Sequence, residues 1–145
     1  MAAQNDGGRD AAKVHVGIRD PVTYRVIGAF FGVYRELGWG FLERVHHHAM
    51  LVALAEVGAR VLSEVALPVH FRGVLVGEYR ADLIVDGAVV VEIKTSESIA
   101  PPHRAQVLNY LKASMYDCAL LLNFGPRPQF ERLVLTADRK AARRS

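Results

Sequence analysis

The chain has 145 residues, 51% of them hydrophobic, which predicts one packed domain and excludes a disordered chain. The formal net charge of +3 lies entirely in residues 136–145, where four basic residues oppose only Asp138. A global positive field that attracts nucleic acid is therefore not indicated for the remainder of the chain. No apolar run approaches the length that spans a bilayer, and the single cysteine, Cys118, lies in an apolar run. We therefore expect a buried thiol, a cytoplasmic protein and no membrane contact.

Three segments are predicted along the chain. Residues 1–19 are expected to be disordered, residues 20–135 to form the single domain, and residues 136–145 to be a basic, solvated tail. Asp20 followed by Pro21 is typical of a helix cap and the first helical residue. Apolar residues at helical spacing then predict a structural helix that ends before Gly38.

A second helix is predicted from about Gly40 to Val57, with a glutamate on its apolar side. Glu43 lies in the same stripe as His47, Met50, Leu54 and Val57. A buried glutamate needs a partner, so Glu43 is either a third carboxylate at a metal site or an ion-paired residue at an exposed helix end. His46, His47 and His48 cannot chelate one ion, because consecutive helical residues point about 100° apart. For His46, a substrate contact and a structural role remain open alternatives.

The stretch from Tyr79 to Lys94 reads YRADLIVDGAVVVEIK and predicts a β-hairpin, because two β-branched runs flank Asp86-Gly87. Three charged residues, Asp82, Glu92 and Lys94, interrupt these runs. Charges in a core-like strand are costly unless they are paired or bound to a metal. Before this hairpin, alternating apolar residues from Val61 to Phe71 predict another strand, and Pro68 places that strand at an edge or a bulge.

The parity of the hairpin loop decides whether the charged residues meet. A two-residue Asp86-Gly87 loop would put Asp82 and Glu92 on opposite faces of the sheet. A three-residue loop, Val85-Asp86-Gly87, would instead place Ile84 opposite Ala88 and Asp82 opposite Val90. We predict the three-residue loop because it places all the charged side chains on one face of the hairpin and leaves the other face apolar. One face then holds Arg80, Asp82, Ile84, Ala88, Val90, Glu92 and Lys94, and the other holds Ala81, Leu83, Val89, Val91 and Ile93.

Two carboxylates that share a face repel each other, and a hard divalent ion such as magnesium relieves that repulsion. The alternative is an ion pair of Lys94 with Glu92 or Asp82.

After the hairpin, Pro101 or Pro102 predicts the start of a helix that reaches about residue 115. Strand 88–94, this helix and a buried strand 118–124 predict a right-handed βαβ unit with parallel strands. Residues 129–135 predict a last strand near an edge, so the fold class is α/β, a mixed β-sheet flanked by helices.

Several motifs together resemble a known family. One pattern is similar to the motif of PD-(D/E)XK nucleases: Ala81-Asp82, followed after nine residues by Glu92-Ile93-Lys94. Ala81 stands at the place of the proline in that motif. Gln106 to Tyr110 resembles the QxxxY element of exonuclease-type members. Gly40 to His46 resembles the signature of the GxxExxY protein family, with His46 in place of the tyrosine. The phrases GEYRADLIV, VEIKTSESI, QVLNYLKAS and LLLNFG are similar to that family in the same order, so the resemblance covers about residues 22–135.

The resemblance implies a restriction-endonuclease-like core and a magnesium-dependent phosphodiesterase that acts on nucleic acid, with manganese as a substitute ion and DNA favoured over RNA. The implied metal ligands are Asp82, Glu92 and the backbone carbonyl of Ile93, with Glu43 in support. Lys94 would position the attacking water and steady the charge of the phosphate. Gln106 and Tyr110 would orient this lysine or the scissile strand.

His46, Arg80 and Arg104 are candidate substrate contacts, although each is also explained as an ordinary structural or surface residue. A homodimer is expected if the protein cuts both strands of a duplex. Two rival interpretations remain open. One is a nucleic-acid-binding or assembly module on the same fold without turnover, and the other is a purely structural protein whose charged residues pair with one another.

Overall fold

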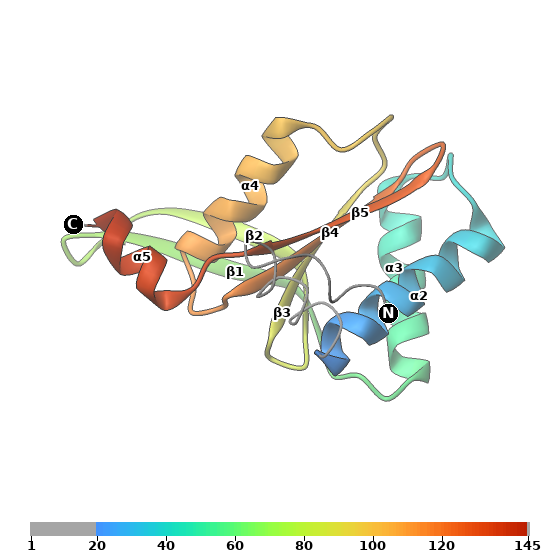
Figure 1. Ribbon diagram of the computed structural model, residues 1–145, viewed down its shortest axis with the longest axis horizontal. Helices are drawn as coiled ribbons and strands as arrows, with labels where there is room; N and C mark the ends of the chain where they lie inside the picture. Colours follow the sequence, from blue (N-terminus) through green and yellow to red (C-terminus); the bar gives the residue numbers. More distant parts are fainter. Residues whose placement is uncertain (1–19, 145) are drawn as a thin grey trace, which may run out of the picture.

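The structure, a computed structural model, describes residues 20–144, and the predicted N-terminal segment 1–19 lies outside them. Its centre is a five-stranded sheet in the order β1-β2-β3-β4-β5 (Figure 1). The strands are β1 (Val61–Phe71), β2 (Val74–Val85), β3 (Val89–Lys94), β4 (Cys118–Phe124) and β5 (Pro128–Val134). Only β3 and β4 pair in parallel, and the other neighbours are antiparallel. The predicted α/β class with a mixed sheet is confirmed.

Helices cover both faces of this sheet (Figure 1). On one face, α2 (Pro21–Leu37) and α3 (Glu43–Glu56) form a core with β3 and β4 that is centred on Phe30, Met50, Leu54, Leu120 and Phe124. On the other face, α4 (Pro101–Lys112) packs Val107, Tyr110 and Leu111 against Val90 and Leu121. The central strands β3 and β4 are therefore buried on both sides, as their apolar runs require. None of the helices in residues 20–144 combines the length and apolar character needed to cross a membrane.

The predicted start and end of the first helix are confirmed. The side chain of Asp20 caps α2 by accepting hydrogen bonds from the Val22 N–H at 3.0 Å and the Thr23 hydroxyl at 2.8 Å. At the other end, Gly38 has φ +67° and its N–H donates to the carbonyl of Tyr34 at 2.8 Å. The parallel β3–α4–β4 unit is also confirmed, with its register running from Val89 opposite Cys118 to Lys94 opposite Asn123.

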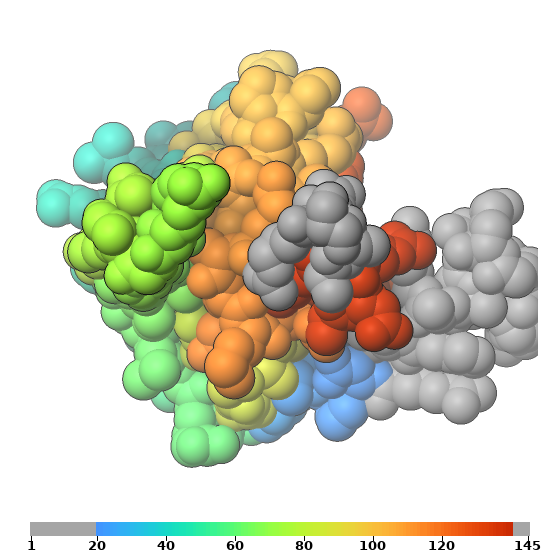
Figure 2. Space-filling view, turned by 90° about the vertical axis from the view of Figure 1, so that its left-hand side faces the viewer, coloured from blue at the N-terminus to red at the C-terminus, as the bar shows by residue number. Residues whose placement is uncertain are grey.

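The first two strands form a hairpin that is longer than the rest of the sheet. β3 pairs with only Leu83 to Val85 of β2, so the remainder of the hairpin projects as an arm (Figures 1 and 2). Its tip exposes apolar side chains such as Phe71, Val74 and Leu75. As Pro68 predicts, β1 is an edge strand, and its register shifts between Val69 and His70.

The side-chain faces of this hairpin reverse partway along it. Val61, Leu83 and Val85 pack with α2 and α3, whereas Val65, Leu67 and Ala81 pack with α4 although their positions have the same parity. The reversal occurs at Glu64 and Asp82, where the β1–β2 pairing is interrupted and Glu64 has φ +58°. The predicted single face with Ala81 and Leu83 is therefore wrong at Ala81. Strict alternation does not hold across an interrupted ladder.

The C-terminal residues differ from the solvated tail that we predicted. Residues Ala137–Arg144 form helix α5, which lies beside the C-terminal end of α4 (Figure 1). Lys140 is only 7% exposed, and its Nζ donates to the backbone carbonyls of Ser114 at 2.8 Å and Tyr116 at 2.6 Å. Lys140 therefore ties α5 to the segment between α4 and β4, where both of these carbonyls lie.

Candidate active site

The hairpin loop has an odd number of residues, as predicted, but lies one residue later. Leu83, Ile84 and Val85 pair with Val91, Val90 and Val89, so the loop is Asp86-Gly87-Ala88. Asp86 and Gly87 have φ of +52° and +63°, and the Ala88 N–H donates to the Val85 carbonyl at 3.0 Å. Asp86 is also anchored outside the hairpin. It exchanges backbone and side-chain hydrogen bonds with Arg60 at 2.7 Å and 2.8 Å and forms an ion pair with Arg25. These contacts fix the turn one residue beyond its predicted position.

Asp82 lies where β2 and β3 separate. The ladder between them ends at Leu83 and Val91, and the next N–H of β3 on this side, from Ile93, donates to Asp82 Oδ2 at 2.7 Å. A side chain thus replaces the backbone acceptor of an ordinary ladder. Burial raises the pKa of Asp82, whereas this hydrogen bond and the charges of His47 and Lys94 lower it.

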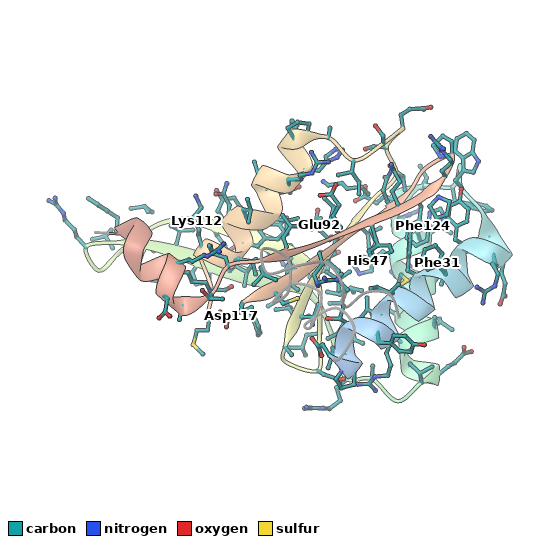
Figure 3. The ribbon with its side chains drawn as sticks, in the orientation of Figure 1. Phe31, His47, Glu92, Lys112, Asp117 and Phe124 are labelled. Carbon is teal, nitrogen blue, oxygen red and sulfur yellow. The ribbon has the colours of Figure 1, made fainter. Side chains whose placement is uncertain are left out.

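Glu92 is a nearly buried carboxylate beside Lys94. It is 4% exposed, on the side of the sheet that α4 covers (Figure 3). Lys94 Nζ lies 3.3 Å from Glu92 Oε2, so the predicted alternative of an ion pair is present in the structure. Burial raises the pKa of Glu92 to about 7, and the charge of Asp82 adds to the effect, while Lys94 and the Tyr110 hydroxyl oppose it. Glu92 therefore binds a proton more readily than an ordinary glutamate.

Gln106 and Tyr110 extend the site from α4. Gln106 Nε2 donates to the hydroxyl oxygen of Tyr110 at 2.9 Å, and Tyr110 is buried. Burial, together with the negative charge of Glu92 and Asp82, raises the pKa of Tyr110. Its hydroxyl therefore keeps its proton and can donate to Glu92. The structure thus brings Asp82, Glu92, Lys94, Gln106 and Tyr110 together.

Glu43 lies at the margin of this group. It is the first residue of α3 and is exposed, not buried in the apolar stripe of that helix. The helix begins at Glu43, whereas we predicted a start near Gly40, and its first two residues are exposed. Although the residue is exposed, partial desolvation of its carboxylate and the charge of Asp82 raise the pKa of Glu43, while Lys94 and His47 lower it. Within residues 20–144, no three His, Cys, Asp or Glu side chains are grouped to hold a metal ion, and the support of a metal by Glu43 stays a prediction.

The predicted substrate contact of His46 is contradicted by its burial. His46 has no solvent exposure, its Nε2 donates to the carbonyl of Gly38 at 3.0 Å, and its ring stacks on Phe124 with centroids 4.1 Å apart. Burial lowers its pKa, which favours the neutral ring. His46 therefore belongs to the core, because α3 turns this side toward α2 and β4 and not toward the site.

The two candidate arginines already have partners. Arg80 is exposed and donates through Nη1 to the carbonyl of Glu64 at 3.0 Å. The reversal of faces at Asp82 means that Arg80 does not share the face of the two carboxylates as predicted. Arg104 forms a two-pronged ion pair with Glu131 of β5, with distances of 2.6 Å and 2.7 Å. Neither guanidinium points into the carboxylate pair in this structure.

Two further polar residues lie beside the site, of which His47 was named in the sequence analysis as a neighbour of Glu43 and Asn123 was not. Asn123 is fully buried at the end of β4, opposite Lys94; its Oδ1 accepts from the Ser96 N–H at 2.8 Å and its Nδ2 donates to the Ser96 carbonyl at 2.9 Å. His47 is buried on α3, its Nε2 is 2.9 Å from the Ser63 hydroxyl, and its charge acts on Asp82 and Glu43. Asn123 had a sequence signal, since a polar residue inside the apolar run CALLLNF needs hydrogen-bond partners.

The donor atoms fit a hard divalent cation. Glu92 Oε1 is buried and has no hydrogen-bond partner, although a buried carboxylate oxygen normally has one. The Asp82 carboxylate is held beside it by Ile93, and both groups have raised pKa values that a cation would lower. Carboxylate and carbonyl oxygens are the ligands that magnesium prefers.

Comparisons with known proteins agree with this geometry. A family model described as the PD-(D/E)XK nuclease superfamily matches residues 20–133. No curated protein sequence matches the chain. Among solved structures, the crystal structure of SSO0001 is similar with a TM-score of 0.50 and 24% identity, over 71% of this chain and 55% of that chain. This chain therefore spans about half the length of SSO0001, and the likeness concerns the fold alone.

Proposed function

Because the chain belongs to the PD-(D/E)XK nuclease superfamily, whose members are metal-dependent nucleases, we propose that it hydrolyses phosphodiester bonds in DNA with magnesium. Manganese is the expected substitute ion, DNA is preferred to RNA, and the GxxExxY type and a cytoplasmic location belong to the same proposal. The observation that carries it is Glu92, a buried carboxylate with one unpartnered oxygen beside Asp82 and Lys94.

Asp82, Glu92 and the carbonyl of Ile93 would hold the cation, and Glu43 would support it from the rim of the site. The cation supplies positive charge that stabilises the phosphate as negative charge develops on it. The Ile93 N–H fixes one Asp82 oxygen, so the carboxylate is oriented before the cation arrives. Binding requires the Glu92 proton to leave, because a carboxylate ligand must be deprotonated.

Among the described residues, Lys94 forms an ion pair with the buried Glu92, with its Nζ 3.3 Å from Glu92 Oε2. From this position it would hold the attacking water and neutralise charge on the phosphate. Tyr110 would donate to Glu92 and keep that carboxylate in place, and Gln106 would hold the tyrosine hydroxyl. Arg80 and Arg104 serve as phosphate contacts only if the substrate competes with their present partners.

A second candidate function rests on the same ion pair. Lys94 neutralises part of the charge of Glu92 without a metal ion. This ion pair favours a nucleic-acid-binding or assembly module that keeps the fold without turnover.

The deciding experiment combines calorimetric titration of magnesium with a cleavage screen. The screen uses single- and double-stranded DNA and RNA, with magnesium or manganese. We expect Asp82→Asn to lose metal binding and cleavage together, because a neutral amide is a poor ligand for a hard cation. Lys94→Ala is expected to keep metal binding and to lose on the order of 10²–10⁴ in cleavage rate. The matched control is Lys112→Ala, an exposed lysine on α4, which should leave both unchanged.

The two candidate functions separate in this experiment. A wild-type protein that binds metal and DNA but never cuts would establish the non-catalytic module. Cleavage that persists at full rate in Asp82→Asn and Lys94→Ala would place the activity in another site or in a contaminating nuclease.

A further inference from the structure

A second polar group lies on the loop that follows Lys94, outside the carboxylate pair. This loop, residues 95–100, leads from the end of β3 to the first turn of α4 (Figure 1). His103 belongs to that first turn, and its two ring nitrogens contact two residues of the loop, Ala100 and Ser96. The side chains of Ser96 and His103 have no role in the function proposed above.

The position of His103 on α4 places it beside the candidate active site. His103, Gln106 and Tyr110 stand at i, i+3 and i+7, so they share one stripe of the helix. The Tyr110 hydroxyl acts on Glu92, and His103 lies about 10 Å from Tyr110 along the helix axis. The ring of His103 is therefore near the Lys94 end of β3, where the charge of Lys94 acts on it.

A backbone hydrogen bond determines which nitrogen of His103 carries the proton. The Ala100 N–H donates to Nδ1 at 3.0 Å, and a ring nitrogen that accepts a hydrogen bond has no proton of its own. The proton of the neutral ring is therefore on Nε2, which lies 3.4 Å from Ser96 Oγ. Burial and the positive charges of Lys94 and Arg104 lower the pKa of His103, which favours this neutral ring.

The direction of these hydrogen bonds leaves the hydroxyl proton of Ser96 without an acceptor. Because the Nε2–H of His103 faces Ser96 Oγ, this oxygen accepts, and its own O–H points elsewhere. Among the described residues, the hydroxyl has no second hydrogen-bond partner. The Ser96 side chain is thus an oriented donor with a free proton, two residues after Lys94.

The backbone of Ser96 is fixed as well. Its N–H and its carbonyl both bond to the buried side chain of Asn123, at 2.8 Å and 2.9 Å. Ser96 itself is half-buried, and the residues on either side, Thr95 and Glu97, are exposed, so the loop borders solvent. A donor whose position is fixed before a ligand arrives binds that ligand with little further loss of conformational entropy.

The neighbouring charge favours an anion as the acceptor. Hydrogen bonds to anionic oxygens are the stronger ones, and the ammonium of Lys94 attracts such an oxygen to this end of β3. The nucleic-acid substrate proposed above carries an anionic phosphate at every nucleotide, and serine hydroxyls are among the groups that contact phosphate oxygens.

We propose that the Ser96 hydroxyl donates to a phosphate oxygen of the nucleic-acid strand beside the scissile bond, and that His103 is the positioning residue that orients this hydroxyl. The contact fixes the strand in register and is made before any cleavage. It rests on the proposed nucleic-acid substrate but not on turnover.

The test is binding of short single-stranded and duplex DNA to the full chain in EDTA, measured by fluorescence anisotropy. We expect Ser96→Ala to raise the Kd about tenfold or more, because a hydrogen bond to a charged group is lost. Ser96→Thr keeps the hydroxyl and should bind DNA about as tightly as the wild type. The matched control is Ser98→Ala, an exposed serine on the same loop, which should leave the Kd unchanged.

The salt dependence of binding separates a direct contact from an indirect one. The slope of log Kd against log salt concentration counts the phosphates that cationic side chains neutralise. Serine has no charge, so Ser96→Ala should weaken binding at every salt concentration with the same slope. A smaller slope in Ser96→Ala would mean that the serine acts by placing Lys94, and it would overturn the direct contact.

His103→Ala tests the positioning role. It removes both the hydrogen bond to Ala100 and the orientation of the hydroxyl, so we expect a lower Tm and weaker DNA binding. Adding His103→Ala to Ser96→Ala should lower the Tm again but not weaken binding further, because His103 acts through Ser96. If Ser96→Ala lowers the Tm and binds DNA like the wild type, the pair only stabilises the loop and the proposal is overturned.

The cleavage screen distinguishes this proposal from the nuclease function. Cleavage by the wild type together with unchanged DNA binding by Ser96→Ala overturns the phosphate contact and keeps the nuclease. A wild type that binds DNA without cutting it, with weaker binding in Ser96→Ala, keeps the phosphate contact and overturns the nuclease. A wild type that binds neither DNA nor RNA overturns both.

Discussion

The Asp82 carboxylate accepts a hydrogen bond from the Ile93 N–H at 2.7 Å, at the point where β2 and β3 part. In an ordinary ladder this N–H would bond to a backbone carbonyl of the neighbouring strand. One carboxylate oxygen therefore completes the hydrogen bonding of β3, and the charge of the same carboxylate acts on Glu92. The same residue contributes both to the stability of the sheet and to the charge of the site, and two substitutions can separate these contributions.

We expect Asp82→Asn to fold almost as stably as the wild type and Asp82→Ala to be less stable by about 1–3 kcal/mol. Asparagine keeps a side-chain oxygen for the Ile93 N–H, whereas alanine leaves that buried donor without an acceptor. Both variants are expected to lose magnesium binding. The measurements are urea denaturation in the presence of EDTA and calorimetric titration. Equal free energies of unfolding for the two variants would show that the hydrogen bond contributes nothing to the fold.

Glu92 predicts a pH dependence of stability with a definite sign. Its pKa is about 7 in the folded protein, against an ordinary 4.5. Between these values the folded state holds a proton that the unfolded state has lost, so the free energy of unfolding falls as pH rises. This difference in pKa corresponds to a destabilisation of the folded state on the order of 3 kcal/mol. The destabilisation is fully present above about pH 7 and absent below about pH 4.5.

Glu92→Gln removes this penalty, because glutamine carries no charge at any pH. We expect the variant to gain stability over the wild type progressively from pH 5 to pH 8, as measured by urea denaturation in EDTA. The control Glu78→Gln, on the exposed hairpin arm, should show no such trend. A stability difference that stays constant over this range would mean that Glu92 titrates normally.

The fold was largely predictable because its signals are local. The Asp20 cap, the odd hairpin loop and the βαβ unit each follow from turn chemistry or side-chain periodicity. The exact register was not predictable, because Asp86 is anchored by Arg60 and Arg25, which are distant in sequence. The reversal of faces at Glu64 and Asp82 likewise arises from a backbone irregularity that no residue pattern indicates.

The site was predictable where motifs fix spacing and not where packing decides. The odd hairpin loop was predictable from side-chain alternation, but Asp82 meets Glu92 where the alternation along β2 is interrupted. His46 and Glu43 depended on where α3 begins and on which side faces the sheet, and both of these are set by tertiary contacts. Burial of His46 against Phe124 and exposure of Glu43 result from the same helix position.

Tyr110→Phe tests the link between α4 and Glu92. Loss of the hydroxyl removes a group that lowers the pKa of Glu92, so that pKa should rise further. If the protein cleaves DNA, we expect the alkaline shift to appear in the pH–rate profile, with a rate loss of about tenfold, smaller than that of Lys94→Ala. Tyr116→Phe, on the same side of the sheet, is the control. A rate loss in Tyr110→Phe without a shifted profile would mean that the tyrosine acts on the substrate and not through Glu92.

The last prediction concerns the buried amide that fixes the chain after Lys94. Asn123 bonds both the N–H and the carbonyl of Ser96, and Gly125 permits this close approach, since a Cβ there would lie 2.3 Å from the Ser96 carbonyl oxygen. We expect Asn123→Leu to lose about 2–4 kcal/mol of stability, because two buried backbone groups lose their partners. Magnesium affinity should change little, because the carboxylates lie on β2 and on β3 before this point.

Hydrogen exchange at the Ser96 amide can be measured without any enzymatic activity. We expect this exchange to be faster in Asn123→Leu and in Gly125→Ala than in the wild type. Because both substitutions release the same contact, their effects on Ser96 exchange and on cleavage should not add in the double variant. Gly77→Ala is the matched control, since a Cβ at Gly77 meets no atom within 4 Å. If Ser96 exchange stays slow while cleavage falls, Asn123 acts on Lys94 by another route than this loop. If cleavage is unchanged while Ser96 exchanges freely, the position of Lys94 does not depend on the loop that follows it.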